Sequence, residues 1–428
     1  MSPWIKAGTL ALTVLTFASN SAFAETSEQD QKIVAAQEKI AQVSIQNRHV
    51  LQYENGKFSG PAWDKLVAEG RDAHFFMIGE EHGIAENPKL AAALYSALTP
   101  SGYSGMVIEV SPFMAGKLDA AARDGLDGLR NLYAEPGGEP PFFGMQEEAQ
   151  MIADVRATIA TDGPMFWGVD YDVTSDQQLF KRLSEKSKPA AAETSLAKVK
   201  QASEVSWAKY RETRGPQYIF SFAGDPQLIR DLRESWLGRD AETSRILHTL
   251  EETLEINRAF MTGDNWGSNQ RRANLIRRSF LEHWKKAKAA GDPPKLLVKM
   301  GASHLVRGRS FSEAFDLGAL LPEIAAQEGK KVVSVMVLPG RKAMTAIFNP
   351  TDFSFQAAPA KDGYAEGLAP ILNAVWDDEF TLIDLRPLRS EIRKTALRND
   401  AQLLRTVMGY DMLLVMSGST PSGELAHD

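Results

Sequence analysis

The feature that most constrains the fold is a series of short apolar runs that recur along the chain and are bounded by Gly, Pro or Asp. Each run has the length and the β-branched and aromatic content of a buried strand. The runs are His74–Gly79, Gly105–Val110, Met165–Asp170, Lys295–Met300, Val332–Leu338, Phe380–Leu385 and Met412–Met416. Most are separated by helical patterns such as Pro88–Leu98, Gln146–Thr161 and Ser390–Val407. This alternation predicts an α/β fold, with a largely parallel sheet flanked by helices.

Two segments interrupt the alternation. The stretch from about Ser175 to Gly291 is helical in pattern and rich in Lys, Arg and Glu, which predicts a helical insertion between two strands of the sheet. Such an insertion forms either a lid over a site or a packing layer. The segment from Pro339 to Gly367 shows little periodicity, which predicts a long surface loop. We expect residues 25–428 to form a single α/β domain that carries this insertion.

The first residues resemble a secretory signal. Lys6 precedes an apolar run from Ala7 to Phe17, and Ala22-Phe23-Ala24 fits a small-x-small cleavage site, which predicts a signal peptide at residues 1–24. The alternative is an uncleaved anchor. No later segment approaches the roughly 20 apolar residues that a membrane span requires. The sequence therefore predicts a periplasmic or secreted protein without a membrane span after cleavage.

Composition excludes several classes of function. The chain has no cysteine, which removes disulfides, thiolate nucleophiles and cysteine zinc sites. A formal net charge of −7 argues against nucleic acid as a partner. The doublets Arg271-Arg272 and Arg277-Arg278 have acidic neighbours on a predicted helix, so we interpret them as a solvated face. Nucleophile-elbow, zincin, phosphate-loop and dinucleotide motifs are all missing from the sequence.

The candidate chemistry is a set of acids and imidazoles at strand ends. Because the carboxyl ends of parallel strands meet at one edge of a sheet, such side chains are expected to share a crevice. The candidates are Glu80, Glu81, His82, Glu109, Asp170 and His304. Glu109 is the most informative of them, because a carboxylate inside an apolar strand requires imidazole, arginine or metal as a partner. The alternative is that these residues, with Asp172, are helix caps and turn formers.

Three motifs resemble, in the same order, those of a superfamily that unites erythromycin-esterase-like proteins, haem-linked ChaN lipoproteins and Tiki/TraB proteases. Gly79-Glu80-Glu81-His82 is similar to its Gly-Glu-x-His strand-end motif, and Val107-Ile108-Glu109 is similar to its second-strand glutamate. Gly301-Ala302-Ser303-His304 is similar to its late Gly-x-x-His motif. The resemblance runs from about residue 70 to the last predicted strand, weakly in the helical insertion.

The resemblance implies a site at the carboxyl edge of an α/β sheet. In erythromycin-esterase-like members, a histidine of the first motif is the general base that activates water for attack on a lactone ester without metal. By resemblance His82 takes this role here, Glu80 or Glu109 orients the ring, and His304 helps to bind the oxyanion or the leaving group. The protein is then an exported hydrolase that cleaves an ester or amide bond in a small-molecule or peptide substrate.

Two departures from the esterase pattern move this chain toward the ChaN and Tiki patterns. Glu80 stands two rather than three residues before His82, and Gly301 replaces the first histidine of the paired late motif. Both argue against macrolide hydrolysis. In Tiki-like members this kind of constellation holds a divalent metal, and His82, His304, Glu80 and Glu109 would supply an N₂O₂ set suited to Zn, Mn or Co.

The alternative from another class is a periplasmic protein that binds haem or an iron-containing ligand, as ChaN-like members do. Haem attachment of that type requires an exposed axial tyrosine or histidine, and Tyr95 and Tyr103 are the available tyrosines. The doubled acid Glu80-Glu81 beside His82 weighs against this alternative.

Overall fold

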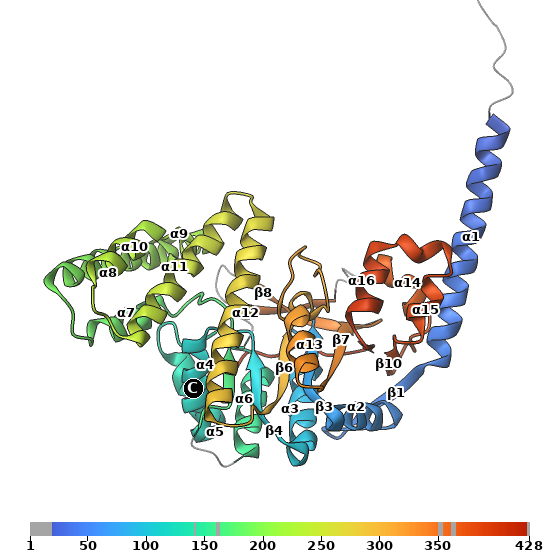
Figure 1. Cartoon of the computed structure of the whole chain (residues 1–428), viewed down its shortest axis with the longest axis horizontal. Helices are drawn as coiled ribbons and strands as arrows, with labels where there is room; N and C mark the ends of the chain where they lie inside the picture. The colour runs from blue at the N-terminus through green and yellow to red at the C-terminus, as the bar shows by residue number, and fades with distance from the viewer. Residues whose placement is uncertain (1–18, 141–142, 160–162, 350–353, 361–364, 426–428) are drawn as a thin grey trace, which may run out of the picture.

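The computed structural model describes residues 19–140, 143–159, 163–349, 354–360 and 365–425 (Figure 1). Most of the predicted signal segment lies outside these residues, and its last six residues open the helix α1 (Ser19–Gln46). In the described part of the chain, no helix is both long and apolar enough to cross a bilayer.

One sheet of nine described strands forms the centre of the protein, in the order β2-β1-β10-β11-β7-β3-β6-β4-β5. Six neighbouring strands of this order, β11, β7, β3, β6, β4 and β5, run parallel to one another. The strand β10 is antiparallel to both of its neighbours, β1 and β11. Their bounds are β1 (Arg48–Glu54), β2 (Lys57–Ser59), β3 (Ala73–Glu80), β4 (Tyr103–Ile108), β5 (Phe166–Gly168), β6 (Lys295–Gly301), β7 (Lys331–Pro339), β10 (Phe380–Asp384) and β11 (Met412–Met416). The predicted α/β class and the largely parallel sheet are confirmed.

Helices cover both faces of the sheet, and the period-two alternation of the strands decides which side chains meet them. In β3 every residue is buried; Phe76 and Ile78 point to one face, and Phe75 and Met77 to the other. The first face packs against α2 (Pro61–Asp72), α3 (Glu86–Leu98), α4 (Pro112–Ala121), α5 (Gly125–Ala134) and α6 (Gln146–Thr158). The second packs against α1, α12 (Asn265–Ala290), α13 (Leu317–Gln327), α14 (Ala365–Leu372), α15 (Leu388–Ile392) and α16 (Ala401–Gly409).

The stretch between β5 and β6, which the sequence marks as an insertion, contains the helices α7 to α12. The first five are α7 (Asp176–Ser184), α8 (Ala190–Thr213), α9 (Phe220–Ala223), α10 (Pro226–Ser235) and α11 (Ala241–Met261). They bury a small core of their own around Leu196, Trp236 and Leu247, and they extend to one side of the sheet in Figure 1. The helix α12 returns the chain to the sheet, where its side chains Phe280 and Trp284 pack against the strands.

The predicted surface loop at 339–367 is wrong in its central part. The strands β8 (Met344–Asn349) and β9 (Ser354–Pro359) form an antiparallel hairpin there. Phe348 and Phe355 face each other across it, with ring centroids 5.4 Å apart. Such a cross-strand aromatic pair stabilises a hairpin that the Gly, Pro and Ala content of the segment conceals.

The predicted helix at 390–407 is also interrupted. After α15 ends, Thr395 and Asp400 each accept a backbone hydrogen bond as an N-cap, so the chain starts a short 3₁₀ turn and then α16. Short polar side chains favour caps over helix interiors.

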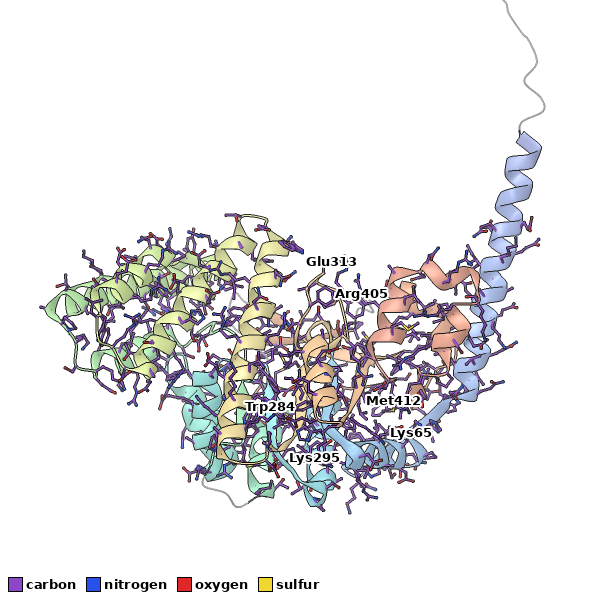
Figure 2. The ribbon with its side chains drawn as sticks, viewed as in Figure 1. Lys65, Trp284, Lys295, Glu313, Arg405 and Met412 are labelled. Atoms are coloured by element: carbon purple, nitrogen blue, oxygen red, sulfur yellow. The ribbon has the colours of Figure 1, made fainter. Side chains whose placement is uncertain are left out.

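The helix α16 also contacts the loop after β6. Its Arg405 pairs with Glu313 at 2.8 Å, and Figure 2 shows the two side chains next to each other.

Candidate functional site

The carboxyl ends of four neighbouring strands, β3, β6, β4 and β5, place the predicted residues together. Glu80 ends β3 and His82 follows it, Glu109 follows β4, and Asp170 follows β5. His304 lies in the 3₁₀ turn η4 (Ala302–Leu305) after β6. Glu109 lies at the centre, because its carboxylate is 3.7 Å from His82 Nε2 and 3.2 Å from His304 Nε2. The two imidazoles therefore share one carboxylate, although 222 positions separate them in the sequence.

The ring of His82 lies between two carboxylates. Its Nδ1 is 3.0 Å from Glu80 Oε1, and its side chain remains 22% exposed. Burial lowers the pKa of His82, but the hydrogen bond to Glu80 and the charges of Glu109 and Glu80 outweigh it and raise the pKa. His82 therefore holds a proton more strongly than an ordinary solvated histidine does.

The hairpin β8–β9 fixes the loop that carries His82. Thr345 Oγ1 donates to the backbone carbonyl of His82, and Ala346 N–H donates to that of Gly83. Gly83 has φ +87°, and a Cβ there would collide with the backbone of Ala346. Only glycine fits this close approach without strain.

Glu109 receives the partners that its burial requires. Arg272 Nη2 donates to its Oε1 at 2.7 Å, and the backbone N–H of Gly301 donates to its Oε2 at 2.5 Å. Burial alone would raise the pKa of Glu109, but the charge and hydrogen bond of His304, with the charges of His82 and Arg272, hold it well below the usual value. Glu109 is consequently an ionised anchor and a weak base.

His304 is held as an imidazolium. Its Nδ1 is 2.7 Å from Asp316 Oδ2, and Asp316 also caps α13. Burial lowers the pKa of His304, but the carboxylates of Glu109 and Asp316 raise it to about 10. Both ring nitrogens thus face carboxylates, so His304 offsets part of their negative charge and holds Glu109 in place.

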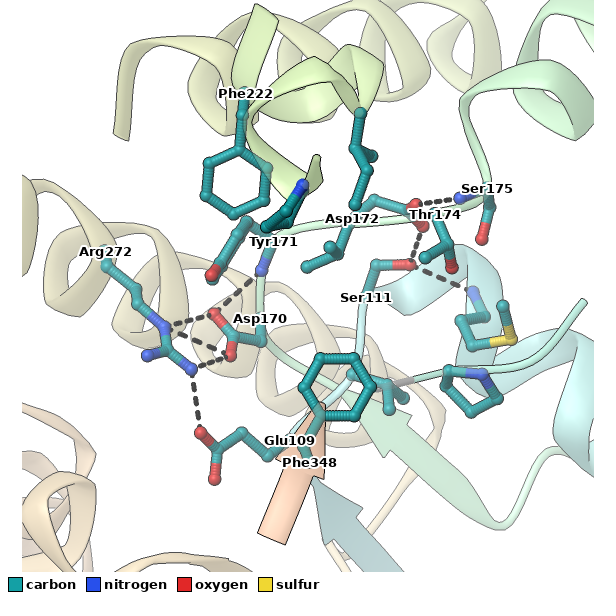
Figure 3. Close-up of a pocket in the computed structure, with 16 residues that line it drawn as sticks. Glu109, Ser111, Asp170, Tyr171, Asp172, Thr174, Ser175, Phe222, Arg272 and Phe348 are labelled. Atoms are coloured by element: carbon teal, nitrogen blue, oxygen red, sulfur yellow. Dashed lines mark hydrogen bonds and ion pairs between the residues drawn. The ribbon is translucent and has the colours of Figure 1, made fainter. Parts of the chain in front are cut away.

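Arg272 is a site residue that the sequence interpretation assigned to a solvated face. Its guanidinium binds Asp170 through Nε at 3.0 Å and through Nη2, and it binds Glu109 through Nη2 as well (Figure 3). The neighbouring Arg271 does lie on the exposed face, where it pairs with Glu252. The sequence gives no signal for this difference, because it depends on the rotation of α12 against the sheet.

A second missed group is Lys299, which is fully buried in β6. Its Nζ donates to Glu80 Oε1 at 2.6 Å and to Glu148 Oε1 on α6 at 2.7 Å. A lysine inside an apolar strand is itself a signal, by the same reasoning that singles out Glu109.

The other acidic candidates, Glu81 and Asp172, have structural contacts. The backbone of Glu81 joins β7 through Val337 and accepts a hydrogen bond from Asn87 Nδ2. Asp172 accepts hydrogen bonds from the hydroxyl of Ser111 and from the backbone of Ser175, as a turn-forming aspartate does.

A cavity of about 190 Å³ adjoins the charged cluster. Glu109, Asp170 and Arg272 form one side of it, and apolar side chains from several elements form much of the rest (Figure 3). The apolar lining residues are Val110, Met114, Pro140, Val173, Pro216, Ile219, Phe222 and Phe348. Phe222 comes from α9 of the insertion and Phe348 from β8, so the inserted helices form a wall of the cavity.

The donor chemistry of the cluster does not fit the predicted metal site. Glu80 is bound by Lys299 and Glu109 by Arg272, so side-chain cations already neutralise the two carboxylates. Across the described residues, no group of three or more His, Cys, Asp or Glu side chains is arranged to hold a metal ion. The tyrosines considered for haem also do not fit, because Tyr95 and Tyr103 are buried.

Comparison with known proteins identifies the fold. A Bacillus cereus protein matches with a TM-score of 0.57 at 15% identity, covering 91% of this chain and 99% of that one. A succinoglycan biosynthesis protein matches with a TM-score of 0.57 at 14% identity and the same coverage. A His-to-Asn mutant of the erythromycin esterase EreC, in its open conformation, matches with a TM-score of 0.55 at 16% identity, covering 89% and 99%.

These likenesses define the fold alone, which is that of the erythromycin-esterase-like proteins. A haem-binding ChaN of Campylobacter jejuni matches with a TM-score of 0.30 at 10% identity, too low to carry an argument. No protein-family model matches the sequence, and no curated protein matches it.

Proposed function

We propose that this protein is an exported hydrolase that cleaves an ester or amide bond with water activated by His82. One observation carries the proposal: the partly exposed ring of His82 lies between the carboxylates of Glu80 and Glu109, at the edge where four strands end. Active sites of open α/β sheets lie at this edge.

The assignment of the base follows from contrasting environments. The pKa of His82 is raised above its usual value, whereas that of Glu109 is held well below its own. A general base must accept a proton during the reaction, so His82, with its raised pKa, suits the role better than Glu109, with its lowered pKa. The Nδ1–H of His82 donates to Glu80, which leaves Nε2 as the nitrogen that accepts a proton.

In the proposed reaction, His82 Nε2 takes a proton from water while the water oxygen bonds to the carbonyl carbon. Arg272 binds Glu109 and Asp170 through Nε and Nη2, so its Nη1 is proposed to donate to the resulting tetrahedral oxyanion, while His304 holds Glu109 in place. When the intermediate collapses, the bond to the leaving oxygen or nitrogen breaks and His82 returns its proton to that atom. The proton balance closes, and the acid and the alcohol or amine leave.

The cavity beside Glu109 is proposed to hold an apolar part of the substrate. Its lining is mostly aliphatic and aromatic, and its volume of about 190 Å³ suits a compact group. This favours a small ester, or a peptide with an apolar side chain, over a bulky lactone ring.

Turnover of a panel of aryl and alkyl esters and peptide amides by purified protein, before and after His82→Asn substitution, tests the proposal. We expect hydrolysis that the substitution reduces by about 10²–10⁴-fold. Equal turnover by the folded variant would remove His82 from the role. A Soret shift on adding haem, without any hydrolysis, would support the haem-binding alternative instead.

Export is proposed from the sequence of residues 1–24 and has its own test. We expect the protein recovered from the periplasm or the medium of a bacterial host to begin near Glu25. Recovery of only the full-length chain from the cytoplasm would contradict this part of the proposal.

A further inference from the structure

Lys299 is a fully buried cation in the interior strand β6, and it binds the same carboxylate that contacts the proposed base. Its neighbours in β6, Val298 and Met300, are completely buried as well. Its ammonium group lies between Glu80 and Glu148, at 2.6 and 2.7 Å, and 5.0 Å from the ring of Phe143. Burying three ionisable groups costs several kcal/mol per ion before pairing, and apolar residues of similar volume are often at least as stable. Stability alone is therefore a weak reason for this arrangement.

The geometry links Lys299 to His82 through a single atom. Glu80 Oε1 accepts from Lys299 Nζ and also faces His82 Nδ1 at 3.0 Å. The ammonium group thus fixes the rotation of the Glu80 carboxylate. That carboxylate in turn determines which ring nitrogen of His82 carries the proton, since a partner on one nitrogen sets the tautomer.

Glu148 completes the arrangement from the opposite side of Lys299. It reaches the ammonium group from α6, and the ionisable groups around it are Glu80, His82 and Tyr133 of α5. Burial raises the pKa of Glu148 to about 7. The Oε2 atoms of Glu80 and Glu148 are buried without a hydrogen-bond partner among the described residues, so each glutamate is held through its other oxygen.

We propose that Lys299 and Glu148 are positioning residues for the hydrolysis: they hold Glu80 as the acceptor for His82 Nδ1, so that His82 presents an unprotonated Nε2 to water. This inference rests on the proposed function, because it assigns a purpose to the orientation of the base. The charged groups that act on His82 itself are Glu80, Glu109 and Lys299, together with Glu148 beyond Lys299.

The first test is Lys299→Met, which keeps the length of the side chain and removes its charge and donors. We expect kcat to fall by about 10²-fold with little change in KM, because a misoriented base affects chemistry more than binding. In ¹⁵N NMR of the histidine rings, neutral His82 should change from the Nδ1–H form to a mixture of tautomers. Lys295→Met is the matched control, since Lys295 begins the same strand and contacts the carbonyl of Arg71 instead.

The second test, Glu148→Gln, covers the case in which the lysine variant does not fold. Gln keeps an oxygen for Lys299 and removes the negative charge that Glu148 gains as the pH rises through about 7, so the acidic limb of the pH–rate profile and the NMR titration of His82 should both move to lower pH. An unchanged tautomer in folded Lys299→Met, or an unmoved titration in Glu148→Gln, would overturn the positioning role. The NMR signals need no turnover, so a tautomer change in a protein that hydrolyses nothing would remove the proposed function and leave the positioning intact.

Discussion

His82 Nε2 and Glu109 Oε2 lie 3.7 Å apart, too far for a direct hydrogen bond and close enough for a shared water molecule. Gly301 lies beside this gap. A Cβ on Gly301 would be 3.2 Å from His82 Nε2 and 3.3 Å from Glu109 Oε2. Because residue 301 is glycine, space remains beside His82 Nε2 and Glu109 Oε2 for the water molecule of the proposed reaction.

Gly301→Ala is expected to reduce kcat by about 10-fold or more, because the new methyl group occupies the space beside the nitrogen that accepts the proton. Steady-state kinetics on the best ester of the panel measures the effect. Gly116→Ala in α4 is the control, since a Cβ there meets nothing within 4 Å and alanine favours a helix. Equal kinetics for Gly301→Ala and the wild type would show that the attacking water lies elsewhere.

The pH dependence of hydrolysis should follow the titration of His82. The base must be unprotonated in the free enzyme, and neighbouring carboxylates raise its pKa above 6.5. We therefore expect kcat/KM to rise with pH, with a midpoint above 6.5, and to level off once His82 is neutral. A pH–rate profile checks this expectation, with His248→Asn as the control because His248 lies on the surface beside Arg278. A midpoint below 6.5 would contradict the assignment.

The strand ends could be predicted from sequence because their physics is local. A run such as Phe75–Ile78 is buried on both faces of the sheet, so its composition identifies it, and the end of the run gives the positions of Glu80 and His82. Because the predicted strands are parallel, their carboxyl ends were expected to meet at one edge of the sheet. The position of Glu109 inside an apolar run indicated a paired carboxylate, and the structure supplies Arg272 and His304 as its partners.

The remaining parts of the site depend on long-range packing. Arg272 and Arg271 are adjacent in the same helix, and only the rotation of α12 places one on Asp170 and the other in solvent. The hairpin β8–β9 depends on pairing between strands that are each partly exposed. Lys299 is different, since a lysine within Leu296–Met300 carried the same signal as Glu109 and could have been recognised.

Replacement of Arg272 should destabilise the fold much more than replacement of the adjacent Arg271. Arg272→Met leaves Glu109 and Asp170 without their shared cation, and removal of one partner from a buried ion pair costs about 3–5 kcal/mol. Arg271→Met removes an exposed pair with Glu252, which contributes about 0–1 kcal/mol. Urea denaturation of both variants measures the difference in the free energy of unfolding. Similar values for the two would show that the Arg272 cluster adds little to stability.

The stability of the fold should decrease at alkaline pH because of His304. Its pKa is about 10 in the folded protein and 6.5 for an ordinary solvated histidine, so the folded state binds more protons than the unfolded chain between these values. The stabilisation is therefore complete below about pH 6.5 and is lost as the pH rises toward 10, by at most about 5 kcal/mol. His304→Gln should be less stable at pH 6 and should lack this slope. Parallel pH slopes for the variant and the wild type in urea denaturation would contradict the imidazolium assignment.

The cavity next to Glu109 should determine which substrates are preferred. Phe222 and Phe348 approach it from the insertion and from the hairpin, and each contributes apolar lining (Figure 3). Phe348→Ala should raise KM for an ester with a phenyl-sized acyl group by about 10-fold and leave an acetyl ester unchanged, since a lost aromatic contact costs about 1–2 kcal/mol of binding. Phe315→Ala is the control, because Phe315 is 55% exposed and lies outside this cavity. If both esters respond equally to Phe348→Ala, the cavity does not hold the acyl group, and the apolar part of the substrate binds elsewhere.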